Sequence, residues 1–184
     1  MSVHAYPTNH LDVPSIAYLF STPNLPGKFD RSAAVDDGHD EKSIREIASD
    51  ISDSAKYRGP TRASRSLLIS GDTSSDVPSF IEMKSSIDVL VHESTFDDSL
   101  EDKAASYGHS TARDAAKIAS HMDVNFLGLT HFSSRFQDLS HLEKEARSVF
   151  NESHILEDGD RISIDLDGLI RLDRKGPEEW ISIV

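Results

Sequence analysis

The sequence predicts an α/β fold, in which short buried strands alternate with helices. Three apolar runs, at residues 66–70, 87–91 and 126–130, have the length and composition of buried strands. A polar residue that can take part in chemistry follows within two residues of each run, and a helical pattern occupies residues 111–122. Polar side chains at the end of a buried strand are where α/β folds commonly place their functional groups.

The helix at 111–122 is the best-defined element. Ser110 or Thr111 can cap it, and Asp114 lies three residues after Thr111, as in a capping box. One narrow apolar face follows at helical spacing, made of Ala112, Ala115, Ala116, Ile118, Ala119 and Met122. Because most of these side chains are small, the helix is expected to pack close to a sheet.

The remaining elements are weaker patterns. Short strands are expected at 3–6 and 15–20, and a strand pair around Asp167–Gly168 at 162–164 and 169–172. Helices are expected at 77–84 and 139–150. Residues 30–65 are polar and acidic with a weak helical period, and predict an arm-like or inserted segment within one domain of residues 1–184.

Composition limits the function. The chain has no cysteine, so a metal must be held by His, Asp or Glu. No apolar run reaches the roughly 18 residues of a membrane span, and the N-terminus lacks a signal-peptide pattern, so we expect a cytoplasmic protein without membrane contact. The net charge of −13 argues against a broad electrostatic surface for nucleic acid.

The polar strand ends predict a metal centre. Asp72, Glu93 and His131 follow the three buried strands, and His10 and His109 lie in loops. Zinc and manganese accept this mixture of imidazole and carboxylate. An aspartate shared by two metals would allow the site to lower the pKa of a bound water and clamp a phosphoryl group.

At these residues the sequence resembles ribonuclease Z, the tRNA 3′-end-processing endonuclease of the metallo-β-lactamase superfamily. The similar motifs are G-D-T at 71–73, H-E-S-T at 92–95, G-H-S-T at 108–111 and L-T-H-F-S-S-R-F at 129–136, with V-P-S-I-A-Y at 13–18 and P-G-K at 26–28 near the start. The resemblance implies an αββα sandwich. It also implies a zinc-dependent phosphodiester hydrolase with two ions, manganese being the alternative, that removes tRNA 3′ trailers.

The resemblance also implies residue roles. His10 and His131 would ligate one metal each, and Asp72 would bridge the two. His109 would donate a proton to the leaving oxygen, oriented by Glu93, because a carboxylate keeps an imidazole in place and protonated. In the last motif, Ser133 and Arg135 would hold the scissile phosphate.

One family signature, H-x-H-x-D-H, does not occur in these residues. We therefore expect the C-terminal half of the sandwich, truncated or split at its start, with an exposed apolar face where the other sheet would lie. The partners implied are precursor tRNA and either a complementing N-terminal half or a second copy of the chain. Alone, the chain is expected to bind metal weakly and to leave precursor tRNA uncleaved.

Other interpretations remain open at this point. The chain could hydrolyse a small phosphodiester, or it could be a non-catalytic remnant that binds another chain. Asp72 could instead cap a helix, and His92 could be a core residue. The remaining histidines are expected to be solvated or to pack, namely His4, His39, His121, His141 and His154.

Overall fold

The computed structural model describes residues 1–83 and 86–184. These residues form two compact units, one made of Met1–Thr22 with Arg65–Val184 and the other of Pro23–Ser64. Each unit has its own core. The larger unit holds all the residues predicted for the metal centre.

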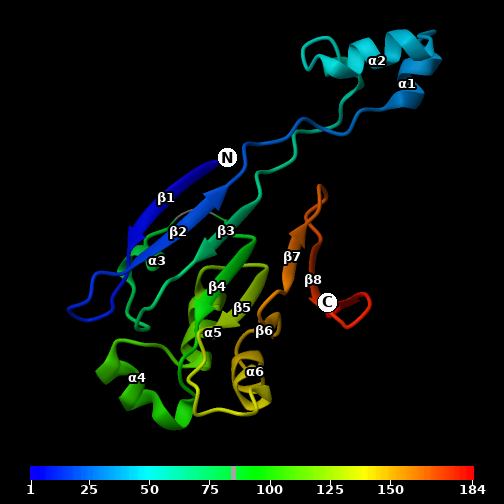
Figure 1. Cartoon of the computed structure of the whole chain (residues 1–184). Coiled ribbons are helices and arrows are strands. Elements are labelled where there is room, and N and C mark those ends of the chain that lie inside the picture. The colour runs from blue at the N-terminus through cyan, green and yellow to red at the C-terminus, as the bar shows by residue number, and fades with distance from the viewer. Residues whose placement is uncertain (84–85) are drawn as a thin grey trace. The chain divides into compact units, whose positions relative to one another are not determined.

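A six-stranded sheet organises the larger unit (Figure 1). Its strands lie in chain order, β1 (Ser2–Pro7), β2 (Ile16–Ser21), β3 (Ser66–Ile69), β4 (Val89–Glu93), β5 (Phe126–Thr130) and β6 (Ser153–Ile155). The first three are antiparallel neighbours, whereas β3 to β6 run parallel. Strands β4 and β5 are buried on both faces, which explains why their sequences are apolar without alternation.

Helices cover one face of this sheet. They are α3 (Pro78–Ile81), α5 (Ala112–His121) and α6 (Ser140–Arg147), while α4 (Glu101–Tyr107) leads into α5. Helix α5 begins as the sequence predicts, because Thr111 and Asp114 form a capping box. Its four alanines are completely buried against the sheet, together with Leu90 and Leu127.

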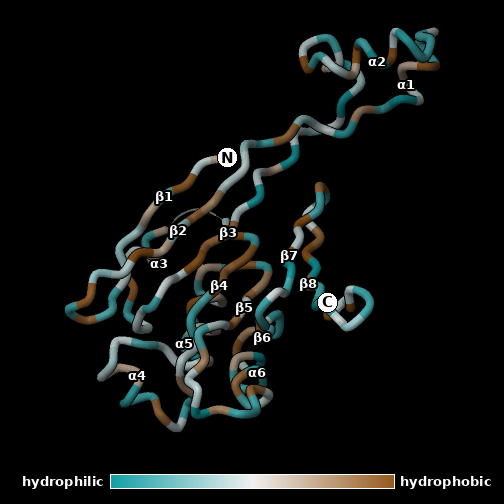
Figure 2. The backbone as a smooth tube through the Cα atoms, in the orientation of Figure 1, coloured by the Kyte–Doolittle hydropathy of each residue, from teal (hydrophilic) through white to brown (hydrophobic). Residues whose placement is uncertain are grey.

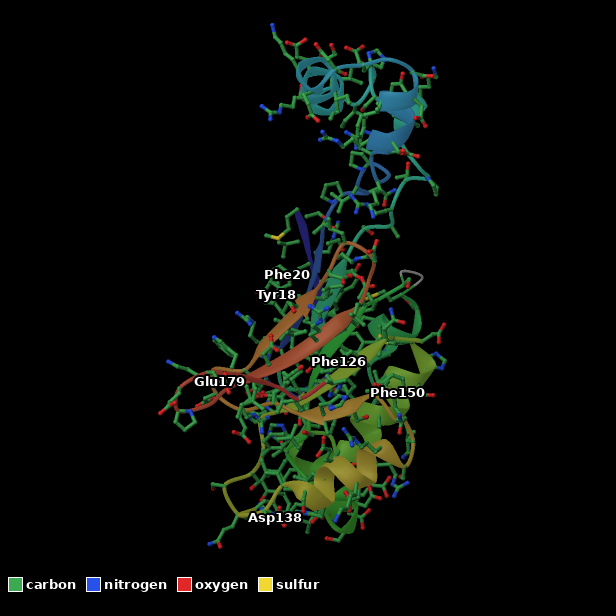
Figure 3. All side chains as sticks on the ribbon, turned by 90° about the vertical axis from the view of Figure 1, so that its right-hand side faces the viewer. Tyr18, Phe20, Phe126, Asp138, Phe150 and Glu179 are labelled. Carbon is green, nitrogen blue, oxygen red and sulfur yellow. The ribbon has the colours of Figure 1, made fainter. Side chains whose placement is uncertain are left out.

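A smaller sheet packs on the other face. Strands β7 (Arg161–Ile164), β8 (Ile170–Lys175) and β9 (Trp180–Ser182) are antiparallel, and the expected hairpin joins the first two. Leu172 of β8 is completely buried and belongs to one apolar cluster with Val89 and Phe126 of the large sheet. Figure 2 shows the apolar strands of the large sheet, and Figure 3 marks Phe126 within it.

The small sheet leaves part of the large sheet's face open. Tyr18 and Ile69 pair across β2 and β3, on the opposite face from Leu19 and Leu68. Tyr18 is 44% exposed and Ile69 38% exposed, whereas Leu19 and Leu68 are buried under the helices. An apolar face of this kind is what an incomplete sandwich is expected to show.

Residues 23–64 form a small helical unit on two extended stretches that meet at the Leu25–Arg62 and Phe29–Arg58 bridges. Its helices are α1 (Arg31–Asp36) and α2 (Glu41–Ser49), followed by a short 3-10 turn. Arg58 donates to the carbonyls of Gly27 and Ala48 and so links both stretches. The unit contains seven basic and eight acidic side chains, so it is nearly neutral overall.

Some predicted boundaries differ from the structure. The helix expected at 77–84 is only the single turn of α3, and Lys84 lies outside the described residues. The helix expected at 139–150 ends at Arg147. The sequence patterns do not predict helix α4 or strands β6 and β9, because these elements are short and carry few apolar side chains, and only neighbouring elements stabilise them.

Candidate metal centre

Five loops and strand ends bring the predicted site residues to one edge of the large sheet. Asp72 lies just beyond β3, Glu93 ends β4, and His131 directly follows β5. These strands are parallel, so their carboxyl ends share one edge. The β1–β2 loop adds His10, and the loop between α4 and α5 adds His109.

Three imidazole rings gather at this edge. The ring centroids of His10 and His109 are 4.7 Å apart, and those of His109 and His131 are 5.4 Å apart with the rings stacked. His109 therefore lies between the other two. The resemblance makes His109 a proton donor and His10 and His131 metal ligands, yet the ring of His109 lies next to both of the others.

In each ring the Nδ1 atom already has an oxygen partner. Nδ1 of His10 lies 2.8 Å from the carbonyl oxygen of Gly108, which can only accept, so this nitrogen carries the proton. Nδ1 of His109 lies 2.8 Å from a carboxylate oxygen of Glu93. The Nδ1 atom of His131 is 2.8 Å from the hydroxyl of Thr95. Nε2 is thus the nitrogen that each ring has left for a metal or a substrate.

Gly108 is required where it stands. Its φ of +73° lies in the left-handed region, and a Cβ there would come within 3.0 Å of His10 Nδ1. Glycine ends α4 at this position and lets its carbonyl approach the imidazole. One backbone position therefore ends a helix and orients a predicted ligand.

Glu93 is a buried carboxylate with a complete set of donors. It is 1% exposed. Its Oε1 accepts from the Thr73 amide at 3.0 Å and from His109. Its Oε2 accepts from the amide and the hydroxyl of Thr95, at 3.0 and 2.8 Å. Four donors offset the cost of burying the charge and hold the carboxylate in one orientation.

Asp72 faces His131 across a cavity. Its Oδ1 lies 3.6 Å from His131 Nε2, and both side chains are nearly half exposed. The cavity has a volume of about 250 Å³ and is lined by Asp72, Glu93 and His131 among others.

Helix α3 is capped at Val77, so the helix-cap interpretation of Asp72 does not hold. His131 itself adopts a left-handed φ of 57°, an uncommon conformation for a residue with a side chain.

The cluster contains ligand atoms close enough together to be candidates for holding a divalent cation, and His109 belongs to both of the groups that they form. Within the described residues, ligand atoms lie within 4.8 Å of one another in two groups, His10 with Asp72 and His109, and Glu93 with His109 and His131. Two atoms bound to one zinc ion at about 2.1 Å can be at most about 4.2 Å apart, and the 3.6 Å between His131 and Asp72 is within that limit. Imidazole nitrogens beside carboxylates are the ligands that zinc and manganese prefer.

Ser133 and Arg135 lie in the loop after β5 and contact each other. Nε of Arg135 donates to the Ser133 hydroxyl at 2.9 Å, and the guanidinium stacks 4.9 Å above the ring centre of Phe96. Phe96 in turn packs beside His109 at 6.2 Å between ring centres. The predicted phosphate-holding pair is therefore connected to the predicted proton donor through one aromatic ring.

The sequence patterns do not single out Thr95, Thr73 or Gly108, which hold the site together. The spacing of Thr95, two residues after Glu93, is a usable signal, because a hydroxyl this close to a carboxylate can bond to it. Nothing local in the sequence indicates that Thr73 or Gly108 faces residues that are distant in the chain.

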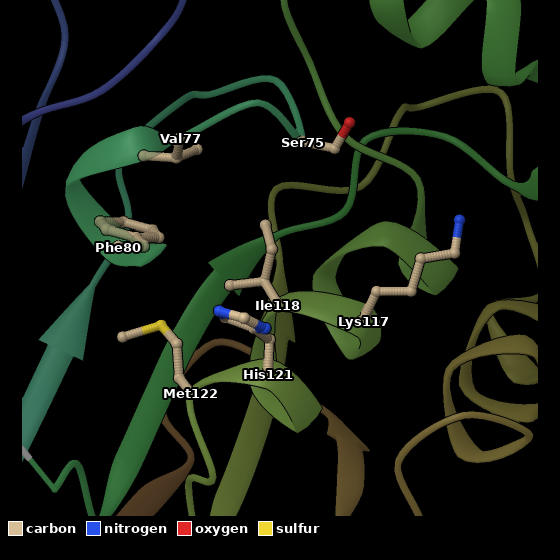
Figure 4. A pocket seen from close by; sticks show the side chains of 7 residues that line it. All are labelled: Ser75, Val77, Phe80, Lys117, Ile118, His121 and Met122. Atoms are coloured by element: carbon tan, nitrogen blue, oxygen red, sulfur yellow. The ribbon is translucent and has the colours of Figure 1, made fainter. Parts of the chain in front are cut away.

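The other histidines lie apart from this cluster. His92 is completely buried, and its Nε2 has no partner among the described residues. His39 bonds to Tyr57, and His154 stacks on Phe126. Figure 4 shows His121 at a separate cavity of about 180 Å³ between α3 and α5, with an apolar lining that includes Phe80 and Met122.

His154 makes stability depend on pH. Its burial, and then the nearby charge of Arg147, lower its pKa below the usual 6.5. Below about pH 6.5 the His154 imidazole binds a proton in the unfolded chain but not in the folded chain. The free energy of unfolding therefore falls as the pH falls. We expect His154→Leu to reduce this slope between pH 7 and 5 by up to about 1.4 kcal/mol per pH unit, measured by urea denaturation.

The control for this measurement is His4→Leu, because His4 is exposed on β1. It should retain the wild-type slope. Equal slopes in the wild-type and His154→Leu chains would contradict the prediction, whatever the substitution does to stability at pH 7.

Comparison with solved structures defines the class of fold. The long form of RNase Z from yeast superposes with a TM-score of 0.55 and 20% sequence identity, over 91% of this chain and 17% of that one. The metallo-β-lactamase fold protein YhfI from Bacillus subtilis gives a TM-score of 0.54 and 19% identity, over 91% and 48%. The chain thus has a metallo-β-lactamase fold over the part that it spans, as predicted.

Comparison with curated sequences is more specific. The chain is 33% identical to ribonuclease Z of Haloferax volcanii over 174 residues, which cover 88% of this chain and 54% of that protein. It is 48% identical to ribonuclease Z of Picrophilus torridus over 91 residues, 50% of this chain and 29% of that one. No family model matches. The predicted resemblance to ribonuclease Z is confirmed, and the chain spans about half the length of the relatives that it matches over most of its own length.

None of the helices in the described part of the chain is long and apolar enough to cross a membrane.

Proposed function

We propose that this chain provides the C-terminal part of a metal-dependent phosphodiester hydrolase of the ribonuclease Z type, which removes tRNA 3′ trailers. The observation that carries the proposal is the cluster of three imidazoles whose Nδ1 atoms are all engaged, beside Asp72 and the buried Glu93. His10 and His131 thus keep Nε2 free for a ligand bond, and the Asp72 carboxylate lies 3.6 Å from Nε2 of His131, an arrangement that suits a catalytic metal.

In this proposal His10, Asp72 and His131 would hold two metal ions, with zinc as the first choice and manganese as the second. A bound metal would supply an activated water and charge neutralisation at the phosphoryl group. His109 is 16% exposed in its side chain, so a substrate can reach its ring. The Glu93 carboxylate accepts from Nδ1 of His109 and so orients the ring, whose Nε2 would give a proton to the leaving oxygen.

Ser133 and Arg135 would hold the scissile phosphate. The Ser133 contact uses Nε of Arg135, and the guanidinium fork has four more N–H donors for phosphate oxygens. The fork stacks on Phe96, and the same ring packs beside His109. The residue proposed to hold the phosphate and the residue proposed to protonate the leaving group would then share Phe96 as a neighbour.

We further propose that cleavage requires a polypeptide that carries the H-x-H-x-D-H ligands, since these 184 residues do not contain that sequence. The exposed face with Tyr18 and Ile69 is consistent with an additional layer there. A cytoplasmic location is part of the same proposal, because tRNA precursors would be the substrate.

A small phosphodiester is the second candidate substrate. The net charge of −13 and the nearly neutral composition of residues 23–64 favour it over a long polyanion, which needs basic surface.

The test mixes the purified chain with the N-terminal part of the Haloferax volcanii relative, in zinc or manganese. We expect the chain alone to leave precursor tRNA intact and the mixture to cleave it, with His131→Ala reducing the rate at least about 100-fold. His4→Ala, on exposed β1, is the matched control and should cleave normally.

Three results would change the proposal. Efficient cleavage by the chain alone, lost in His131→Ala, would remove the need for a complementing part. Turnover of a small model diester without cleavage of precursor tRNA would favour the second substrate. A mixture that forms a complex and cleaves neither substrate would favour a non-catalytic binding subunit.

A further inference from the structure

Thr95 lies between the buried carboxylate and a predicted metal ligand. It follows β4 by two residues and is 8% exposed. Its hydroxyl oxygen is 2.8 Å from Oε2 of Glu93 and 2.8 Å from Nδ1 of His131. The same oxygen is 3.4 Å from Nδ1 of His109, a longer and weaker approach.

The protons in this chain of contacts can be assigned. An ionised carboxylate only accepts, so the single hydroxyl proton of Thr95 points to Glu93. The hydroxyl oxygen then offers only lone pairs to His131, whose Nδ1 must be the donor. His131 is thereby set in the tautomer with a proton on Nδ1 and a free lone pair on Nε2, which is the atom that faces Asp72.

His131 needs such a contact more than the other two rings do. Its side chain is 48% exposed, whereas that of His109 is 16% exposed. His10 is held independently, through the carbonyl of Gly108. A half-exposed imidazole at a strand end would otherwise rotate and take either tautomer.

We propose that Thr95 is a positioning residue that passes the orienting effect of Glu93 to His131. One buried carboxylate then serves two histidines, His109 directly through Oε1 and His131 through the Thr95 hydroxyl on Oε2. The inference rests on the proposed function only in taking His131 to be a metal ligand. The tautomer itself is a property of the metal-free chain.

The test compares Thr95→Val, which removes the hydroxyl at nearly constant shape, with Thr95→Ser, which keeps it. Long-range ¹⁵N–¹H NMR of the metal-free chain at pH 8 reports which nitrogen of each ring carries the proton. We expect His131 to be protonated on Nδ1 in the wild-type and Thr95→Ser chains and to shift towards Nε2 in Thr95→Val. His10 is the internal control, because Gly108 should hold its tautomer in all three.

Zinc affinity gives the second measurement, by competition with a coloured chelator. Loss of an orienting partner typically weakens metal binding by about 10–100-fold, so we expect that loss in Thr95→Val and near wild-type affinity in Thr95→Ser. A protein that has merely lost packing would shift the His10 signals as well, so unfolding and loss of orientation are told apart.

The inference is overturned if His131 carries its proton on Nε2 in the wild-type chain, or if Thr95→Val changes neither tautomer nor zinc affinity. A tautomer shift in Thr95→Val, in a chain that cleaves no phosphodiester even with its complementing part, would support the role of Thr95 and contradict the proposed function.

Discussion

Replacing Glu93 by glutamine is expected to destabilise the chain by about 2–6 kcal/mol, because each buried donor left without its acceptor costs about 1–3 kcal/mol. The carboxylate is 1% exposed and accepts four hydrogen bonds. A glutamine amide has one acceptor oxygen and turns an NH₂ group towards donors, so at least two donors lose their partner. Urea denaturation of the metal-free chain measures the change.

Glu93→Gln should also impair the proposed function strongly. Both His109 and His131 depend on this carboxylate, the first directly and the second through Thr95. Glu178→Gln removes the same charge at an exposed position and serves as the control. If the two variants unfold at the same urea concentration, the Glu93 network contributes little to stability and its orienting role loses its physical basis.

Replacing Leu127 by alanine is expected to cost about 2–5 kcal/mol, because it leaves a cavity where the surrounding core cannot collapse. Leu127 is completely buried at the centre of β5, beside Leu90 of β4 and under the alanines of α5. For a chain of this size the melting temperature should fall by roughly 5–20 °C. Thermal unfolding followed by circular dichroism measures it.

Strand β5 ends immediately before His131, so this substitution also tests the coupling between core and site. At temperatures where the variant is folded, zinc affinity should equal that of the wild-type chain. Leu166→Ala, at a 55% exposed position between β7 and β8, is the control and should melt normally. Equal melting temperatures for Leu127→Ala and Leu166→Ala would show that the burial of Leu127 in β5 contributes little to stability.

Much of the fold can be predicted because its signals are local. The apolar run at 126–130 predicts strand β5 with its observed bounds, and the capping box of α5 is formed by the two side chains that the sequence indicates. A buried parallel strand needs a continuous apolar run, and a helix start needs a capping side chain, so both leave a mark within a few residues.

The elements that the sequence does not predict have no such mark. Strand β6 contains Ser153 and the buried His154, and it is a strand because β5 offers it backbone hydrogen bonds. The unit of residues 23–64 likewise includes extended stretches on each side that pair with one another. Pairing over such separations cannot be recognised in a short stretch of sequence.

The site divides in the same way. The sequence motifs are sufficient to indicate His10, Asp72, Glu93, His109 and His131, and the roles given to these residues remain predictions. The contacts between them come from the fold, above all the shared position of Thr95 and the carbonyl of Gly108 that meets His10.

The sequence by itself determined which chemical groups the chain offers, where its buried strands lie and which family it resembles. Only the tertiary structure decided which nitrogen of each histidine stays free. A tautomer is set by the atom that faces the opposite side of the ring, and for His10 that atom comes from Gly108, which is 98 residues away in the chain.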